Sequence, residues 1–417
     1  GTVGIYAENN TQAGRDKVIV KNDSQLTVGN DGVGIAVLSS PIETGQKQGN
    51  PLVPVAGVNH GAGSDQGGTI TVTASGTGSD IITGVNGEGI YAEDSDINLT
   101  GGDYVIETKE KGIGIFASGN TKVNGTLEYK YNGSATGTGM GIVYDQDKAS
   151  SLTNYANVKL TNSTNTTGGM VGLYTTAAAG NKFINNGNVE GKSTALEFGI
   201  VTNGADVENA GKITLMGNGS SALYSKGSGT INGAPGKITI GANGSGIYVV
   251  NAGSTGSNYG EITIGAGSVG MRAENGRIKN YSTGKISSTA EKATGMSQSG
   301  NENLENEGTI TLTGNQSVGM HSEGVTAAGH QMINKGIVTV GHSATATSPS
   351  IGMYAANTDK TTIINNGKVI AGNKSTGIYG GNVTLNNNSE TSAGNGGIGV
   401  YSKGGTVDIK ENAKISV

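Results

Sequence analysis

The chain has 417 residues, of which 75 are glycine, and it contains no cysteine and no tryptophan. The missing cysteine excludes a disulfide framework and a thiolate metal site. A formal charge of only −5 at pH 7 gives no field to attract nucleic acid, and no apolar run approaches the roughly 18 residues of a membrane-spanning helix.

The chain begins at Gly1, shows no signal peptide and ends at Val417 within a strand-like run. We therefore expect it to be a piece of a longer protein. The polar residues are mainly Gly, Ser, Thr and Asn, and only 14% of residues are charged. Disordered chains usually combine low hydrophobicity with high net charge, so this composition favours stacked strands and tight turns.

One phrase recurs along the whole sequence: a small residue, an aliphatic residue and, in many copies, an aromatic residue. Four successive steps between copies measure 24, 24, 25 and 24 residues, which is typical of a solenoid. The copies begin at Gly4, Gly34, Gly89, Gly114, Gly141, Gly172, Ala195, Ala222, Gly246, Gly270, Gly295, Gly319, Gly352, Gly377 and Gly399.

Each repeat contains three short strand-like runs, as residues 300–323 illustrate. The first run ends at Asn306, the second spans residues 309–313 and the third spans residues 317–322. Aliphatic residues alternate with polar ones, which indicates strands with one buried face. We predict an all-β, right-handed parallel β-helix with three-strand coils of about 24 residues, forming a single solenoid over residues 1–417 with loop insertions.

Insertions of uneven length interrupt the repeat. The longest, residues 38–68, carries three of the five prolines, and we expect it to leave the solenoid as a loop. Insertions in solenoids often form the binding face, so Pro51, Leu52, Val53 and Pro54 are candidate ligand contacts. Residues 342–350 and 161–168 are shorter candidate insertions.

An asparagine closes the first run of many repeats, usually two residues before a glycine. Asparagine tolerates turn conformations and carries both an amide donor and a carbonyl acceptor. Stacked at one corner, these side chains are expected to pair along the solenoid as a structural ladder. The set consists of Asn185, Asn209, Asn258, Asn306, Asn334 and Asn365.

In the third run, aliphatic residues such as Val318 and Met320 are expected in the core, so the residues between them face outward. The outward position is mostly aromatic, and we interpret that row as a stabilising ladder. Its members are Tyr6, Tyr91, Phe116, Tyr174, Tyr224, Tyr248, Tyr354, Tyr379 and Tyr401.

Three consecutive repeats replace the aromatic ring with Arg272, Ser297 and His321. Two residues further along, and therefore on the same face, lie Glu274, Ser299 and Glu323. Arginine offers a rigid fork of donors for carboxylate or hydroxyl groups. We identify Arg272, Glu274, Ser297, His321 and Glu323 as a candidate polar ligand-binding patch, with Arg277 expected beside it.

Metal and catalytic motifs are weak. Two acidic pairs, Asp94 with Asp96 and Asp145 with Asp147, have spacings that suit a shared Ca²⁺, but we favour the interpretation that they are solvated turn carboxylates. The tripeptide at residues 277–279 resembles one motif of the polygalacturonases, whose other motifs are absent. We therefore expect no catalytic, cofactor-binding or metal-binding residues, and no enzymatic activity.

The phrases "IINNGKVIAGNKSTGIYGGN", "YSKGGTVDI" and "GTITLTGNQSVGMHSEG" resemble the passenger regions of large type V autotransporter adhesins, most closely the fusobacterial outer-membrane type. The resemblance covers essentially the whole chain. It implies a β-helical passenger exposed at the cell surface, exported through a C-terminal β-barrel translocator that lies outside this fragment.

The resemblance also implies a role in virulence through adhesion to a host cell-surface glycan or protein receptor, or to a partner bacterium. Two other functions stay open at this point. One is a carbohydrate-active β-helix enzyme, either a polysaccharide lyase or a hydrolase. The other is a purely structural spacer within a longer fibre.

Overall fold

In the computed structural model the chain forms two compact units, Gly1–Ala195 and Leu196–Val417. The described residues contain strands and turns but no α-helix, and they offer no helix long and apolar enough to cross a membrane. The described residues are 2–10, 19–22, 24–40, 69–93, 95–119, 121–134, 137–145, 151–162, 169–176, 182–191, 195–345 and 347–417.

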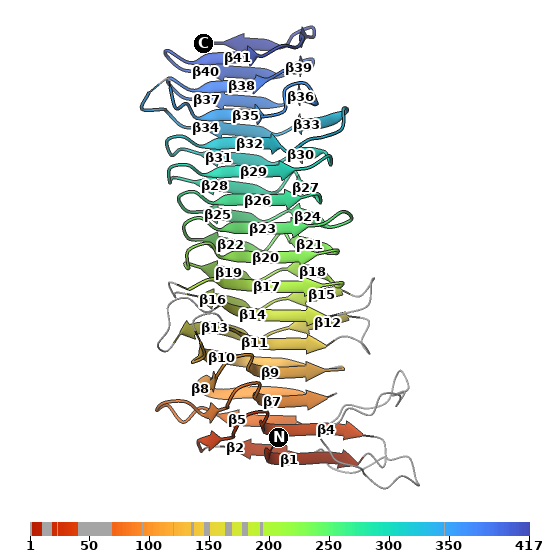
Figure 1. The fold of residues 1–417 in the computed structure, drawn as a ribbon, viewed down its shortest axis with the longest axis vertical. Helices are drawn as coiled ribbons and strands as arrows, with labels where there is room; N and C mark the ends of the chain where they lie inside the picture. Colours follow the sequence, from red (N-terminus) through yellow and green to blue (C-terminus); the bar gives the residue numbers. More distant parts are fainter. Residues whose placement is uncertain are drawn as a thin grey trace. The chain divides into compact units, whose positions relative to one another are not determined.

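Unit 1 arranges its described strands in three parallel sheets, which we name A, B and C (Figure 1). Sheet A contains β1 (Val3–Asn10), β4 (Val33–Ser40), β7 (Glu88–Glu93), β9 (Ile113–Ser118), β11 (Thr138–Asp145) and β14 (Gly169–Thr176). Sheet B contains β2 (Ile19–Asn22), β3 (Leu26–Thr27), β5 (Thr69–Thr73), β6 (Ile81–Ile82), β8 (Asp96–Thr108), β10 (Val123–Tyr131), β13 (Asn157–Asn162) and β16 (Asn188–Gly191). Sheet C contains β12 (Ser151–Asn154) and β15 (Lys182–Asn185).

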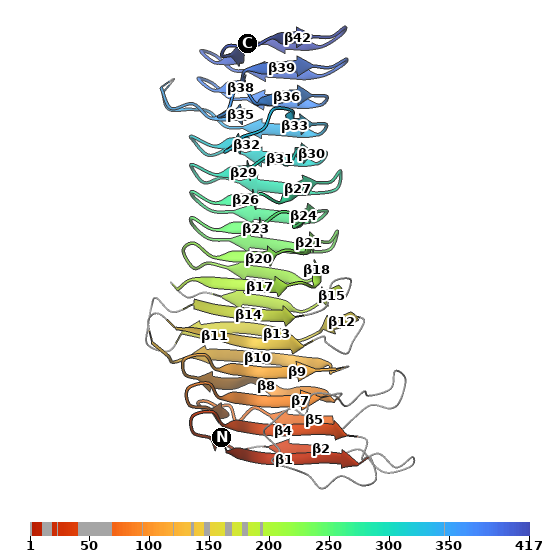
Figure 2. The same ribbon diagram turned by 45° about the vertical axis from the view of Figure 1, so that its right-hand side comes forward.

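Unit 2 repeats the same three-strand coil with greater regularity (Figure 2). Its sheet A strands are β17 (Glu197–Asn203), β20 (Ser221–Lys226), β23 (Ser245–Val250), β26 (Val269–Glu274), β29 (Thr294–Ser299), β32 (Val318–Glu323), β35 (Ile351–Ala355), β38 (Thr376–Gly380) and β41 (Ile398–Ser402). Its sheet B strands are β19 (Lys212–Leu215), β22 (Lys237–Ile240), β25 (Glu261–Ile264), β28 (Lys285–Ser288), β31 (Thr309–Leu312), β34 (Ile337–Val340), β37 (Lys368–Ala371), β40 (Glu390–Ala393) and β43 (Lys414–Ser416). Its sheet C strands are β18 (Asp206–Asn209), β21 (Gly229–Asn232), β24 (Thr255–Asn258), β27 (Arg277–Asn280), β30 (Leu304–Asn306), β33 (His330–Asn334), β36 (Thr361–Asn365), β39 (Asn382–Leu385) and β42 (Val407–Ile409).

Each strand pairs in parallel with the corresponding strand of the next coil. In sheet B of unit 2, Ile238 faces Ile262, and Ile262 faces Ile286 in the coil after it. All three side chains are buried, so like residues stack into a continuous apolar column. This arrangement confirms the predicted parallel β-helix.

The sheet A strands depart from simple alternation at a glycine. In β32, Val318 is only half-buried, whereas Gly319 and Met320 are both buried. The prediction that Val318 lies in the core is therefore wrong, because two consecutive residues face inward at this point. A Cβ at Gly319 would overlap the side chain of Val338 and the carbonyl oxygen of Gly352, which is why glycine recurs there.

The asparagines at the end of the sheet C strands form a buried amide ladder. In unit 2 each Nδ2 donates to Oδ1 of the asparagine in the next coil, at 2.8–3.0 Å, from Asn209 to Asn365. In unit 1 Asn154 donates to Asn185 in the same way at 2.8 Å. The ladder ends where Asn365 faces Leu385 and its amide donates to Thr391 instead.

The ladder includes three asparagines that the sequence pattern did not identify: Asn154, Asn232 and Asn280. The carbonyl that accepts from Asn232 or Asn280 belongs to a glycine four residues later, Gly236 or Gly284, and the one that accepts from Asn154 belongs to Ala156, two residues later. Each of the three still donates to the backbone carbonyl at that position. The turn length therefore varies while the hydrogen bond that closes the turn is kept.

We predict that Asn258→Ala lowers the free energy of unfolding by about 1–3 kcal/mol, because it removes one hydrogen bond from each of the buried amides of Asn232 and Asn280. Chemical denaturation measures the change. The matched control is Asn218→Ala, which breaks an exposed amide pair with Asn243 of 2.7 Å and is expected to cost less than about 0.5 kcal/mol. Equal losses in the two variants would contradict a stabilising role for burial of the ladder.

Candidate ligand-binding surface

The outward row of sheet A in unit 2 is set by strand register. Consecutive partners are Tyr224, Tyr248, Arg272, Ser297, His321, Tyr354, Tyr379 and Tyr401. The structure therefore places the three residues that replace tyrosine or phenylalanine in adjacent coils of one row. In unit 1 the equivalent row reads Tyr6, Ala36, Tyr91, Phe116, Val143 and Tyr174. Its interruptions are apolar, so the break in unit 2 differs in chemistry.

The rings of this row contact one another at about the spacing of the coils. Tyr379 and Tyr401 stack with centroids 4.9 Å apart, and Tyr224 meets Tyr248 edge to face at 5.4 Å. Such aromatic neighbours add about 0.5–1.5 kcal/mol beyond the area they bury. The aromatic part of the row therefore stabilises the stack of coils.

Arg272 lies against Tyr248 at the near side of the break. Its guanidinium carbon lies 5.0 Å from the ring centroid, and its Nη2 donates to Oε1 of Glu274 at 2.6 Å. Burial is the main cause that raises the pKa of Tyr248 to about 12, and a hydrogen bond with Glu274 adds to the rise. The arginine head is thus held by a ring and a carboxylate while its side chain stays 46% exposed.

His321 forms the far side of the break. Its ring stacks on Tyr354 with centroids 5.2 Å apart and an interplanar angle of 9°. Burial lowers the pKa of His321, and the nearby carboxylate of Glu323 opposes that shift. The imidazole is therefore neutral at pH 7 and behaves as a flat ring.

Ser297 lies between these two groups, facing Arg272 in one neighbouring strand and His321 in the other. Glu274, Ser299 and Glu323 form the parallel row two residues further along. We call Arg272, Glu274, Ser297, Ser299, His321 and Glu323 the polar break. Arg277 begins β27 of sheet C, and only the turn residues Asn275 and Gly276 separate it from Glu274.

The remaining sequence-predicted sites fall elsewhere. In the long insertion, residues 38–40 end β4, and residues 41–68, with Pro51, Leu52, Val53 and Pro54, lie outside the described residues. Asp94 and Asp147 also lie outside them. Residues 342–350 connect β34 to β35, and Ser343 is held there by Ser375 at 2.8 Å.

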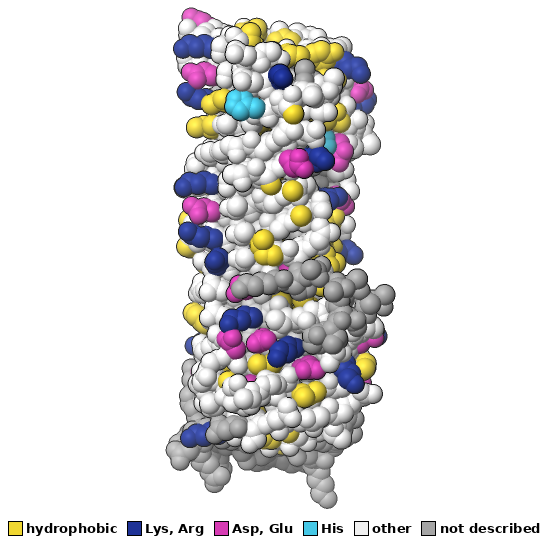
Figure 3. Space-filling view, turned by 90° about the vertical axis from the view of Figure 1, so that its left-hand side faces the viewer, with side chains coloured by type: hydrophobic (Ala, Val, Ile, Leu, Met, Phe, Trp, Pro, Cys, Tyr) yellow, Lys and Arg dark blue, Asp and Glu magenta, His cyan; other side chains and the backbone are white. Residues whose placement is uncertain are grey.

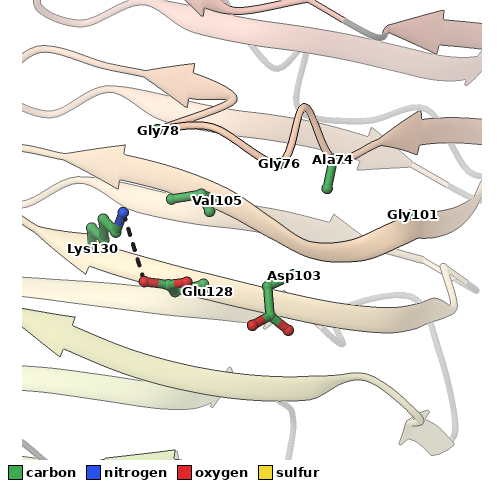
Figure 4. A pocket seen from close by; sticks show the side chains of 8 residues that line it. All are labelled: Ala74, Gly76, Gly78, Gly101, Asp103, Val105, Glu128 and Lys130. Carbon is green, nitrogen blue, oxygen red and sulfur yellow. Dashed lines mark ion pairs between the residues drawn. The ribbon is translucent and has the colours of Figure 1, made fainter.

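A recess of about 270 Å³ opens on sheet B of unit 1 (Figure 4). It arises because β8 pairs with β5 over residues 96–100 and with β6 over residues 106–107, while the chain between β5 and β6 loops out. Asp103 and Glu128 line the recess, but Lys159 and Lys130 already pair with them at 2.6 and 3.7 Å. Its polar groups are therefore largely satisfied internally.

Comparison with known families identifies the chain. The model of the BigA third pectate lyase-like domain matches residues 120–358, which is more than half of the sequence. The chain belongs to this family. The match includes the polar break and all of the asparagine ladder up to Asn334. Comparisons with curated proteins and with solved structures found no match.

The family name refers to a lyase-like domain, so the arrangement of acidic and metal-binding side chains among the described residues bears on catalysis. Among them, no three His, Cys, Asp or Glu side chains are placed to hold a metal ion. Glu305 and Glu307 on sheet C are close together, but they form ion pairs with Lys279 and Lys335. Hydrogen bonding to Lys279 lowers the pKa of Glu307.

A charged row on sheet B of unit 2 was not recognised in the sequence. Register aligns Lys212, Lys237, Glu261 and Lys285, and it aligns Lys368, Glu390 and Lys414 further along the same row. Glu261 pairs with both lysines beside it, at 3.5 and 3.6 Å. Basic and acidic side chains alternate along the left edge of Figure 3. The sequence does contain a sign of this row: in most repeats of unit 2, a Lys or Glu is the first residue of the second strand-like run.

We predict that the imidazole of His321 titrates below pH 6.5, and lower still in the Glu323→Gln variant. Burial disfavours the cation, and removing Glu323 removes the one attraction that opposes this effect. Histidine NMR signals followed against pH measure both midpoints. Glu261→Gln, on another sheet, serves as the control and leaves the midpoint unchanged; a rise in the midpoint of the Glu323 variant would contradict the assignment.

Proposed function

We propose that this chain is a surface-exposed, adhesin-type β-helix passenger that binds its ligand through side chains on its outer face. Membership of the BigA domain family and the parallel β-helix both support this function. The resemblance to fusobacterial autotransporter adhesins extends the proposal to a bacterial outer membrane and to type V secretion. The ligand would be a host cell-surface glycan or protein, or a component of a partner bacterium.

The observation that carries the proposal is the polar break. The outward row of unit 2 is otherwise built of rings and one valine, Val201, which faces Tyr224. At Arg272, Ser297 and His321 the same row presents donors and acceptors at successive coils instead. Stability alone favours rings at these positions, because cross-strand aromatic pairs stabilise a sheet. A polar surface in the middle of such a row fits recognition of a ligand.

We infer that the polar break serves binding and not catalysis. Arg272 and Glu274 pair with each other at 2.6 Å, and the side chain of Glu323 is exposed, so neither carboxylate lies in the enclosed, unpaired setting typical of a general acid. A carbohydrate-active enzyme is the second candidate, because the family is described as pectate lyase-like. The two candidates predict different results with the purified chain.

We expect Arg272→Ala and His321→Ala to weaken binding to host or bacterial cells by about 5–30-fold each, the usual effect of removing a central contact residue. Surface plasmon resonance or flow cytometry with the labelled chain measures the loss. Lys285→Ala is the control, because it removes an exposed cation from sheet B. Full binding by both variants, with folding verified by circular dichroism, would place the ligand contacts elsewhere.

We expect the purified chain to release no unsaturated or reducing ends from polygalacturonate or other acidic polysaccharides, with and without Ca²⁺. Ultraviolet absorbance detects unsaturated ends, and a reducing-sugar assay detects hydrolysis. Product formation that scales with protein concentration would replace the adhesin proposal with the enzyme. An active pectate lyase run alongside shows that the assay works.

A further inference from the structure

The polar break leaves one position of the row, Ser297, without a flat side chain. Around it, neighbouring flat groups repeat at 4.9–5.4 Å, as in the pairs Tyr379–Tyr401 and Tyr224–Tyr248. Ser297 occupies the same register position but carries only a hydroxymethyl group. Each side chain next to Ser297 contacts the ring beyond it: Arg272 contacts Tyr248, and His321 contacts Tyr354.

The size of this space follows from the coil spacing. Arg272 and His321 stand two coils apart, which is about 9.6 Å at 4.8 Å per coil. A ring in van der Waals contact with both needs about 3.5–4 Å on each side, or about 7–8 Å in all. A single ring therefore fits between the guanidinium and the imidazole, in the place that a tyrosine side chain takes in other coils.

The groups around the space decide which ring is suited to it. One side is bordered by Glu274, Ser299 and Glu323, and the other by Thr294 between Val269 and Val318, all partly or fully exposed. Carboxylates and hydroxyls match a ring that carries several hydroxyl groups. An apolar aromatic side chain would desolvate them without replacing their hydrogen bonds, which costs free energy.

The local charge narrows the choice further. Arg272 contributes one positive charge, and Glu274 and Glu323 contribute two negative charges. The neutral imidazole of His321 contributes none. The sum of −1 disfavours a uronate or any other acidic sugar. A neutral pyranose meets the conditions, because its C–H face packs on a flat ring whose face carries partial negative charge.

We propose that the gap at Ser297 is a subsite for one neutral pyranose ring, stacked between Arg272 and His321 with its hydroxyl groups bonded to Glu274, Ser299 and Glu323. This proposal rests on the adhesin function above and names the class of ligand: a glycan with an accessible neutral hexose. It also separates this surface from the acidic polysaccharides that a pectate lyase acts on.

The proposal is tested with two substitutions at Ser297. Ser297→Tyr restores the ring that other coils carry, and Ser297→Ala removes the hydroxyl while keeping the space open. Saturation-transfer NMR with methyl β-galactoside, methyl β-glucoside and methyl β-glucuronide measures binding to the whole chain. We expect a neutral glycoside to bind, Ser297→Ala to retain that binding within about twofold, and Ser297→Tyr to lose at least about tenfold.

Thermal unfolding shows whether the filled variant is folded, and we expect its midpoint to equal or exceed that of the parent. Binding of neutral glycosides by the stable Ser297→Tyr variant at parental strength would overturn the subsite. Preferential binding of the glucuronide would overturn the charge argument. Binding of N-acetyltyrosinamide with no binding of any glycoside would show that the gap receives an aromatic side chain of a protein partner.

Cell binding separates this proposal from the broader one. If the chain adheres to cells and Ser297→Tyr adheres equally well, the subsite is wrong and the adhesin function stands. If the chain adheres to no cell but binds the neutral glycoside at Ser297, the subsite stands and the adhesin function fails.

Discussion

The structure depends on in-register parallel pairing between successive coils. Because each backbone strand hydrogen-bonds to its counterpart one coil away, every position in the repeat becomes a column of side chains about 4.8 Å apart. Within each unit the same rule builds the apolar columns, the amide ladder and the aromatic row. A residue is therefore judged by its neighbours in the column as much as by its neighbours in sequence.

This rule explains how much of the fold the sequence could predict. The repeat period predicted the three-strand coil. The asparagines two residues before Gly187 and Gly211, Asn185 and Asn209, were predicted as members of the amide ladder. The prediction for Val318 failed because simple alternation cannot show that Gly319 and Met320 both face inward. That geometry depends on the close approach of Val338 and Gly352, which lie in later coils.

The candidate site also has a part that the sequence could predict and a part that it could not. Composition and spacing placed Arg272, Ser297 and His321 in one row, because their register follows from the repeat. The orientation of their heads could not be predicted, since it depends on contacts with Tyr248 and Tyr354. The recess on sheet B of unit 1 was also beyond sequence reasoning. It exists because one long strand, β8, pairs with two short ones.

Interior and exterior carry different kinds of information. Inside, the asparagines and aliphatic residues repeat with little variation, and a substitution there acts on stability. On the outer face, positions tolerate change. A polar group such as Arg272 therefore meets a requirement other than the stacking that the aromatic rings provide. The BigA family match spans both kinds of position, and it is the outer face that can distinguish one member's ligand from another's.

The charged row on sheet B has a consequence for assembly of the stack. Identical columns, such as the amide ladder, cannot tell one coil from the next, so a strand that docked one coil out of place would lose little there. Glu261 between Lys237 and Lys285, and Glu390 between Lys368 and Lys414, mark individual coils by charge. If the strands slipped by one coil, Lys237 would face Lys285 and Lys368 would face Lys414. Repulsion between like charges therefore disfavours pairing in which a coil is skipped.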